Sequence, residues 1–87
     1  MVNKEVVQVP GLKVIGPYSQ AVRAGGLLFV SGQPGVDPST GEAVGSSFEA
    51  QARQAFRNLE TVVRAGGSQP NLVVSTTVLV ADVSSFP

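Results

Sequence analysis

Residues 15–33 read IGPYSQAVRAGGLLFVSGQ, and this stretch predicts a β-hairpin. Residues 20–24 and 27–31 form two apolar-rich runs that are separated by Gly25 and Gly26. Two consecutive glycines can adopt the positive φ angles that a tight two-residue hairpin turn requires. We therefore expect two antiparallel strands whose turn lies at the two glycines.

Polar side chains gather at the open end of this predicted hairpin. Because side chains alternate with a period of two, pairing outward from the turn places four polar residues on one face: Tyr18, Gln20, Ser31 and Gln33. Val22 and Phe29 lie beside them as an apolar floor, whereas Arg23 lies on the opposite face. Gly32 has no side chain, so a ligand could approach its backbone closely. These residues form a candidate binding site.

Two alternatives stay open for this polar cluster. Strand ends are often polar only because they meet solvent, and a one-residue slip of register would move Tyr18 to the opposite face. Ser31 has no His or Cys partner, since the chain contains neither residue type, so an activated serine nucleophile is not supported. Three glutamates are better explained by turn, capping and helix-surface positions than as paired catalytic acids: Glu42, Glu49 and Glu60.

Residues 46–67 change to a helical period. Ser46 and Glu49 match the S-x-x-E capping box that opens a helix, and Gly66 with Gly67 supplies a stop. Seven apolar residues share one stripe of this helix: Phe48, Ala52, Ala55, Phe56, Leu59, Val62 and Val63. The opposite face is charged, with two pairs at the favourable i, i+4 spacing: Glu49–Arg53 and Glu60–Arg64.

Further elements are predicted on both sides of this helix. Residues 37–42, DPSTGE, have turn composition, and a short strand is expected over residues 42–44. Residues 72–81, LVVSTTVLVA, are rich in β-branched residues and predict a strand. Neither of its faces is clearly polar, so we expect a central strand, reached from the hairpin by a right-handed crossover. One helix cannot cover both faces of such a sheet, and residues 82–85 (DVSS) offer helix N-caps with no helix after them, so we expect missing C-terminal elements.

Composition restricts the class of protein. The 87 residues suffice for one small domain, and six Lys and Arg residues balance six Asp and Glu residues, which argues against broad attraction to nucleic acid or anionic lipid. Only 14% of residues are charged, whereas about 25% is usual, so we expect part of the surface to be covered by another chain or by a further piece of this one. No secretory signal or apolar run of membrane-spanning length is present, and we expect a soluble intracellular protein.

Four blocks of the sequence resemble, in order and spacing, the RidA/YjgF family of reactive intermediate imine/enamine deaminases, also called L-PSP endoribonucleases. The blocks are IGPYSQAV, LLFVSGQPGVDPSTGE, QARQAFRNLETVVRAGG and VVSTTVLVADVSSF. The resemblance implies an α+β, chorismate-mutase-like fold with a helix packed on one face of the sheet. Residues 1–87 would form a single domain of this type that lacks its C-terminal helix and strands.

The resemblance also implies a function. Family members hydrolyse 2-iminobutanoate, 2-iminopropanoate and related enamine or imine intermediates to 2-keto acids and ammonia, as homotrimers and without a metal or organic cofactor. The resemblance places Tyr18, Ser31 and Gly32 in the substrate-binding cleft. The family's late Arg, which binds the substrate carboxylate as a planar guanidinium can, and its late Glu would lie beyond residue 87. The catalytic residues are therefore unknown in this sequence, and the chain alone is expected to be poorly active.

Two other functions stay open at this point. One is a non-catalytic trimeric ligand-binding or interaction protein with the same fold. The other is an RNA-acting translation inhibitor or endoribonuclease, against which the balanced charge and the lack of an aromatic and basic surface argue. The expected partners are a small 2-imino or 2-keto acid and two further copies of the chain, with no membrane. The expected location is cytoplasmic, with the mitochondrion as the alternative.

Overall fold

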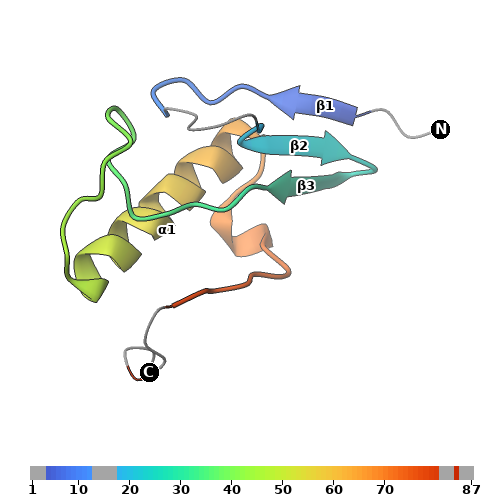
Figure 1. Cartoon of the computed structure of the whole chain (residues 1–87). Coiled ribbons are helices and arrows are strands. Elements are labelled where there is room, and N and C mark those ends of the chain that lie inside the picture. Colours follow the sequence, from blue (N-terminus) through green and yellow to red (C-terminus); the bar gives the residue numbers. More distant parts are fainter. Residues whose placement is uncertain (1–3, 13–17, 81–83, 85–87) are drawn as a thin grey trace.

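The computed structural model describes residues 4–12, 18–80 and 84. These residues form a three-stranded antiparallel sheet, one long helix and one short 3-10 helix (Figure 1). In chain order the elements are β1 (Lys4–Val7), β2 (Ala21–Ala24), β3 (Leu27–Val30), α1 (Phe48–Ala65) and η1 (Pro70–Leu72). The strand order is β1-β2-β3, and α1 packs against one face of the sheet, so the α+β class is confirmed. In this described part of the chain, no helix has the length and apolar character needed to cross a bilayer.

The hairpin of β2 and β3 has the predicted turn and register. Gly25 and Gly26 have φ angles of 60° and 79°, which side chains with a Cβ rarely adopt. Because both turn residues have a left-handed backbone conformation, the turn matches the twist of the flanking strands. Val22 lies opposite Phe29, and the paired strands end where Ala21 lies opposite Val30. Residues 15–17 of the quoted stretch lie outside the described residues.

Strand β1 extends the hairpin to three strands. Lys4–Val7 pairs antiparallel with β2, and Val6 lies opposite Val22. Only two of its four residues are apolar, too short a pattern for a prediction from sequence. The strand contributes Val7 to a small core with Ala21 and Val62. Four half-buried apolar residues surround that core: Val9, Leu12, Leu28 and Val30.

Helix α1 begins one residue later than the predicted capping box requires. Ser47, not Ser46, is the N-cap, because its hydroxyl accepts a hydrogen bond from the Ala50 N–H at 3.1 Å. The predicted ion pairs are present, with Arg64 Nε 2.9 Å from Glu60 Oε2 and Arg53 bonded to Glu49.

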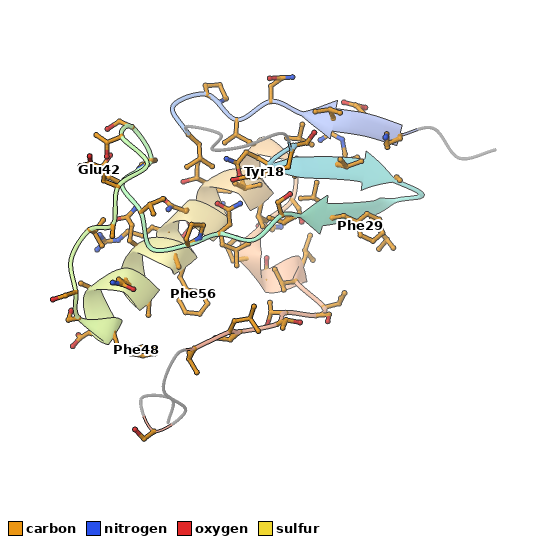
Figure 2. All side chains as sticks on the ribbon, viewed as in Figure 1. Tyr18, Phe29, Glu42, Phe48 and Phe56 are labelled. Carbon is orange, nitrogen blue, oxygen red and sulfur yellow. The ribbon has the colours of Figure 1, made fainter. Side chains whose placement is uncertain are left out.

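The predicted apolar stripe of α1 is only partly buried. Val62 and Val63 lie in the interior, whereas Phe48 and Phe56 are exposed on one side of the helix (Figure 2). The first half of the helix extends past the four-residue strands, so the sheet does not reach these two rings.

The end of α1 is fixed by its own turn and by the sheet. Gly67 has φ of 85°, and the Ser68 and Gly67 N–H groups bond to the Val63 and Arg64 carbonyls, the pattern of a Schellman motif. Arg23 of β2 donates one hydrogen bond to the Gly66 carbonyl oxygen and another to Glu5 Oε1, at 2.5 Å. A guanidinium at the negative end of the helix stabilises it.

The predicted central strand over residues 72–81 is wrong for this structure. Pro70–Leu72 is a 3-10 helix, and residues 73–80 are extended but unpaired (Figure 1). Val74 and Leu79 are both 91% exposed, so neither face is covered. A strand requires hydrogen bonds to a neighbouring strand, and no strand within the described residues borders this segment. Ala81 and residues 82, 83 and 85 lie outside the described residues.

Candidate functional site

A small hollow lies at the open end of the hairpin, between the start of β2, the 33–38 loop and α1. Its volume is about 20 Å³, which is room for one water molecule. Eight residues line it: Leu12, Tyr18, Gln20, Gln33, Pro34, Val36, Pro38 and Asn58. The predicted cluster of polar residues is thus partly assembled, because Tyr18, Gln20 and Gln33 surround one hollow.

Two glutamine amides join the strands at the mouth of this hollow. Gln33 Nε2 donates to Gln20 Oε1 at 2.9 Å and to the Ser31 carbonyl oxygen at 3.1 Å. Gln20 is only 5% exposed. A buried amide without partners would cost roughly 1–3 kcal/mol, so this pairing allows Gln20 to lie in the interior. The amides therefore fix the conformation of the chain directly after β3.

Asn58 of α1 closes the other side of the hollow and was not among the predicted site residues. Asn58 is 2% exposed, and its Nδ2 donates to the Pro34 and Val36 carbonyl oxygens at 3.2 and 2.9 Å. Its Oδ1 accepts from Gln54 Nε2 at 2.9 Å. The available signal was its position four residues before Val62, which places a polar side chain on the buried stripe.

The predicted substrate-binding residues lie in different surroundings. Tyr18 lines the hollow and is 42% exposed. Ser31 does not line it; its hydroxyl donates to the Ser19 carbonyl oxygen, and its N–H donates to the Gln20 carbonyl oxygen at 2.9 Å. Gly32 is exposed and has open space where a Cβ would be. All three lie at the same end of the hairpin, and their role in binding stays a prediction.

The predicted apolar floor of Val22 and Phe29 does not line the hollow. Phe29 is 57% exposed and projects outward from β3 (Figure 2), and neither it nor Val22 lines the hollow. Regular alternation applies only within the ladder, which ends at Val30. Beyond that point the chain turns toward α1, so the apolar part of the lining comes from Leu12 and three loop residues: Pro34, Val36 and Pro38.

No charged residue lines the hollow within the described residues. Arg23 does not line the hollow; it bonds to the Gly66 carbonyl oxygen at the end of α1 and to Glu5. Arg53 lies in a second, open hollow of about 400 Å³ along the first turns of α1, where it pairs with Glu49. Among the described residues, no group of His, Cys, Asp or Glu could hold a metal ion. The hollow therefore offers neutral hydrogen-bonding groups and no partner for a carboxylate.

The turn over residues 37–42 contains a carboxyl group whose pKa is lowered, that of Asp37. The Ser39 hydroxyl and N–H, and then the Thr40 N–H, donate to Asp37 Oδ1 and lower the pKa of this carboxyl group. Val36 forms an isolated bridge with Ala43, which is what remains of the short strand predicted over residues 42–44. This turn holds Pro38 at the edge of the hollow.

Comparison with known proteins gives the family. The sequence model of the endoribonuclease L-PSP family matches residues 10–87, and the chain therefore belongs to this family. A 2-iminobutanoate/2-iminopropanoate deaminase of Mus musculus is 41% identical over 86 residues, which cover 99% of this chain and 64% of the mouse protein. The RutC family protein y4sK of Sinorhizobium fredii is 47% identical over 72 residues, which cover 83% of this chain and 57% of that protein.

Solved structures agree with this assignment. A RidA structure from Psychrobacter sp. PAMC 21119 has a TM-score of 0.70 at 38% identity and covers 77% of this chain. A putative endoribonuclease L-PSP from Entamoeba histolytica has a TM-score of 0.71 at 37% identity and covers the same share of the chain. The match covers 55% and 54% of those two chains. The chain thus spans between about half and two thirds of the length of the relatives that it matches.

Proposed function

We propose that the protein acts on 2-imino acids and hydrolyses them to 2-keto acids and ammonia. The observation that carries this proposal is the match, over nearly the whole chain, to proteins named as 2-iminobutanoate/2-iminopropanoate deaminases. The uncharged hydrogen-bonding groups at the hairpin end support it, because an imine and the ketone that replaces it are both recognised by neutral donors and acceptors.

The reaction needs only water as co-reactant. Water adds to the imine carbon, and the resulting carbinolamine loses ammonia as the carbonyl group forms. Tyr18 offers a phenolic donor at the hollow. The Ser31 hydroxyl donates a hydrogen bond to the Ser19 carbonyl oxygen, so its own oxygen can still accept one from an imine N–H or a water molecule. These groups would orient the reacting carbon, and they leave the substrate carboxylate without a cation.

The small volume of the hollow bears on where the substrate binds. A cavity of about 20 Å³ holds one water molecule and not a four-carbon acid. We therefore place the substrate outside the hollow, against Tyr18, Ser31 and Gly32. These three residues would form one wall of a cleft, and a further surface would form the other. A guanidinium on that surface would bind the carboxylate in a bidentate ion pair. In this proposal the further surface belongs to a second copy within a homotrimer.

Hydrolysis of freshly generated 2-iminobutanoate tests the proposal, with the mouse relative assayed in parallel. At a concentration where the chain is monomeric, we expect it to release 2-oxobutanoate faster than buffer does but more slowly than the mouse protein, because none of the residues that line the hollow is a cation. A rate equal to that in buffer, together with no binding of 2-oxobutanoate, would contradict the proposed function. A rate equal to that of the mouse protein from the monomeric chain would contradict the need for a further surface.

A second candidate is a ligand-binding protein without turnover, and the lack of a charged lining residue favours it. Saturable binding of 2-oxobutanoate without any acceleration of imine hydrolysis would select it. An RNA-acting function is the third candidate, which six basic and six acidic residues do not favour. Salt-sensitive RNA binding would be required to support it.

A further inference from the structure

The 33–38 loop is the part of the candidate site with the least regular structure. The ladder ends at Val30, and the next strand-like contact is the isolated bridge at Val36. Between these points the backbone makes three hydrogen bonds to the backbone of other described residues: the Ser31 N–H donates to the Gln20 carbonyl oxygen at 2.9 Å, the Val36 N–H to the Pro34 carbonyl oxygen at 2.9 Å, and the Val44 N–H to the Gly35 carbonyl oxygen at 3.2 Å. Pro34 has no N–H to donate. None of these backbone bonds joins the loop to α1, so side chains make its hydrogen bonds to the helix.

One amide on α1 makes the hydrogen bonds between the helix and this loop. The two N–H bonds of Asn58 Nδ2 go to the Pro34 and Val36 carbonyl oxygens, so a single side chain holds both ends of a three-residue segment. Gln54 donates to Asn58 Oδ1 and thereby keeps the amide oriented with its NH2 group toward the loop. All three bonds lie where Asn58 is 2% exposed, so water does not compete for them.

The residue between the two carbonyls shows how closely the loop approaches α1. A Cβ on Gly35 would overlap the Gln51 backbone, at 2.5 Å from its Cα. Gln51, Gln54 and Asn58 are spaced i, i+3 and i+7, so they share one face of α1. The loop is therefore held against this face at two points, by close contact at Gly35 and by hydrogen bonds at Asn58.

Asparagine is an unfavourable choice for a buried helical position unless its hydrogen bonds are needed. It has a lower helix propensity than leucine and must lose its hydration on burial. The loop that it holds carries Gln33, whose amide bonds to Gln20 and to the Ser31 carbonyl oxygen. A shift of the loop would thus move the chain at Ser31 and Gly32, where the substrate is placed.

We propose that Asn58 is a positioning residue of the candidate site: from α1 it sets the placement of the 33–38 loop and, through Gln33, of the Ser31–Gly32 wall. This inference rests on the proposed function for its consequence in binding. The effect of Asn58 on the conformation of Gln33, Ser31 and Gly32 can be measured without any ligand.

The test compares Asn58→Leu with Val62→Ala, which removes buried volume from the same helix face without lining the hollow. NMR spectra of the 15N-labelled chain report the Gln33 side-chain NH2 group and the Ser31 and Gly32 amides. The fluorescence of Tyr18 reports the hollow, because the chain has one Tyr and no Trp. We expect Asn58→Leu to shift these signals and to accelerate hydrogen exchange of the Gln33 NH2 group at least tenfold. We expect Val62→Ala to leave them near those of the wild type at comparable loss of stability.

Titration with 2-oxobutanoate supplies the functional readout. We expect at least tenfold weaker binding to Asn58→Leu than to Val62→Ala. If the wild-type chain does not bind 2-oxobutanoate, the proposed function fails, while the ligand-free signals still decide the positioning role. If Asn58→Leu does not fold, Gln54→Leu removes only the group that orients the amide, and the same signals are read there. Unchanged Gln33, Ser31 and Tyr18 signals, or equal changes in the Val62→Ala control, would overturn the inference.

Discussion

Gly35→Ala should destabilise the protein by overpacking one contact. An alanine Cβ at this position would overlap the backbone of Gln51, which a side-chain rotation cannot relieve. Either the loop or the helix must move, and such overpacking costs about 1–3 kcal/mol. A chain of this length is stable by roughly 4–13 kcal/mol, so the loss would be a substantial part of the total. Taking about 2 kcal/mol, and about 4–8 °C of Tm per kcal/mol for a domain of this size, we expect Tm to fall by about 10 °C.

Gly32→Ala, three residues earlier in the chain, is the matched control. It has nothing within 4 Å of the added Cβ and no positive φ, so we expect a change within about 0.5 kcal/mol. Thermal unfolding followed by far-UV circular dichroism measures both variants, since α1 supplies the helical signal. A Tm for Gly35→Ala within about 2 °C of the wild type would refute the close approach of the loop to α1.

Three further predictions concern the helix ends and the turn. Ser47→Ala should cost about 1 kcal/mol in urea unfolding, whereas Ser46→Ala should cost almost nothing, because only Ser47 caps α1; equal effects would contradict the observed cap. Arg23→Met should destabilise more than Glu5→Gln, because the exposed ion pair contributes little and only Arg23 also bonds to the end of α1; the reverse order would contradict this. The pKa of Asp37 is lowered on folding, so its stabilisation is complete above about pH 4 and is lost as pH falls through the folded value. The Tm difference between the wild type and Asp37→Asn should therefore shrink in acid, and a difference independent of pH would count against this role.

Local signals were sufficient for the hairpin and for the helix. The turn at Gly25 and Gly26 fixes the register of β2 and β3 by itself, because a two-residue loop leaves no freedom in pairing. The helix follows from its period, and its stop follows from Gly67, whose positive φ completes the Schellman motif. Its start differs by one residue because two adjacent serines both fit an N-cap.

Features that depend on distant parts of the chain could not be predicted in this way. The composition of residues 72–81 is that of a strand, but pairing needs a neighbour that composition does not specify, and residues 73–80 have none in the described structure. Asn58 was missed because its hydrogen-bond partners lie 22 and 24 residues earlier. The lining of the hollow differs from the prediction because alternation stops being a guide once the ladder ends at Val30.

Titration of the 15N-labelled chain with 2-oxobutanoate, followed by NMR, tests directly whether a 2-keto acid binds at the end of the hairpin. We expect saturable shift changes that cluster at Tyr18, Ser31 and Gly32. We also expect weaker binding by Tyr18→Phe and Ser31→Ala, each of which removes one hydroxyl from the proposed wall. Shift changes that do not saturate, or that cluster instead along the first turns of α1 at Arg53, would contradict a substrate site at the end of the hairpin.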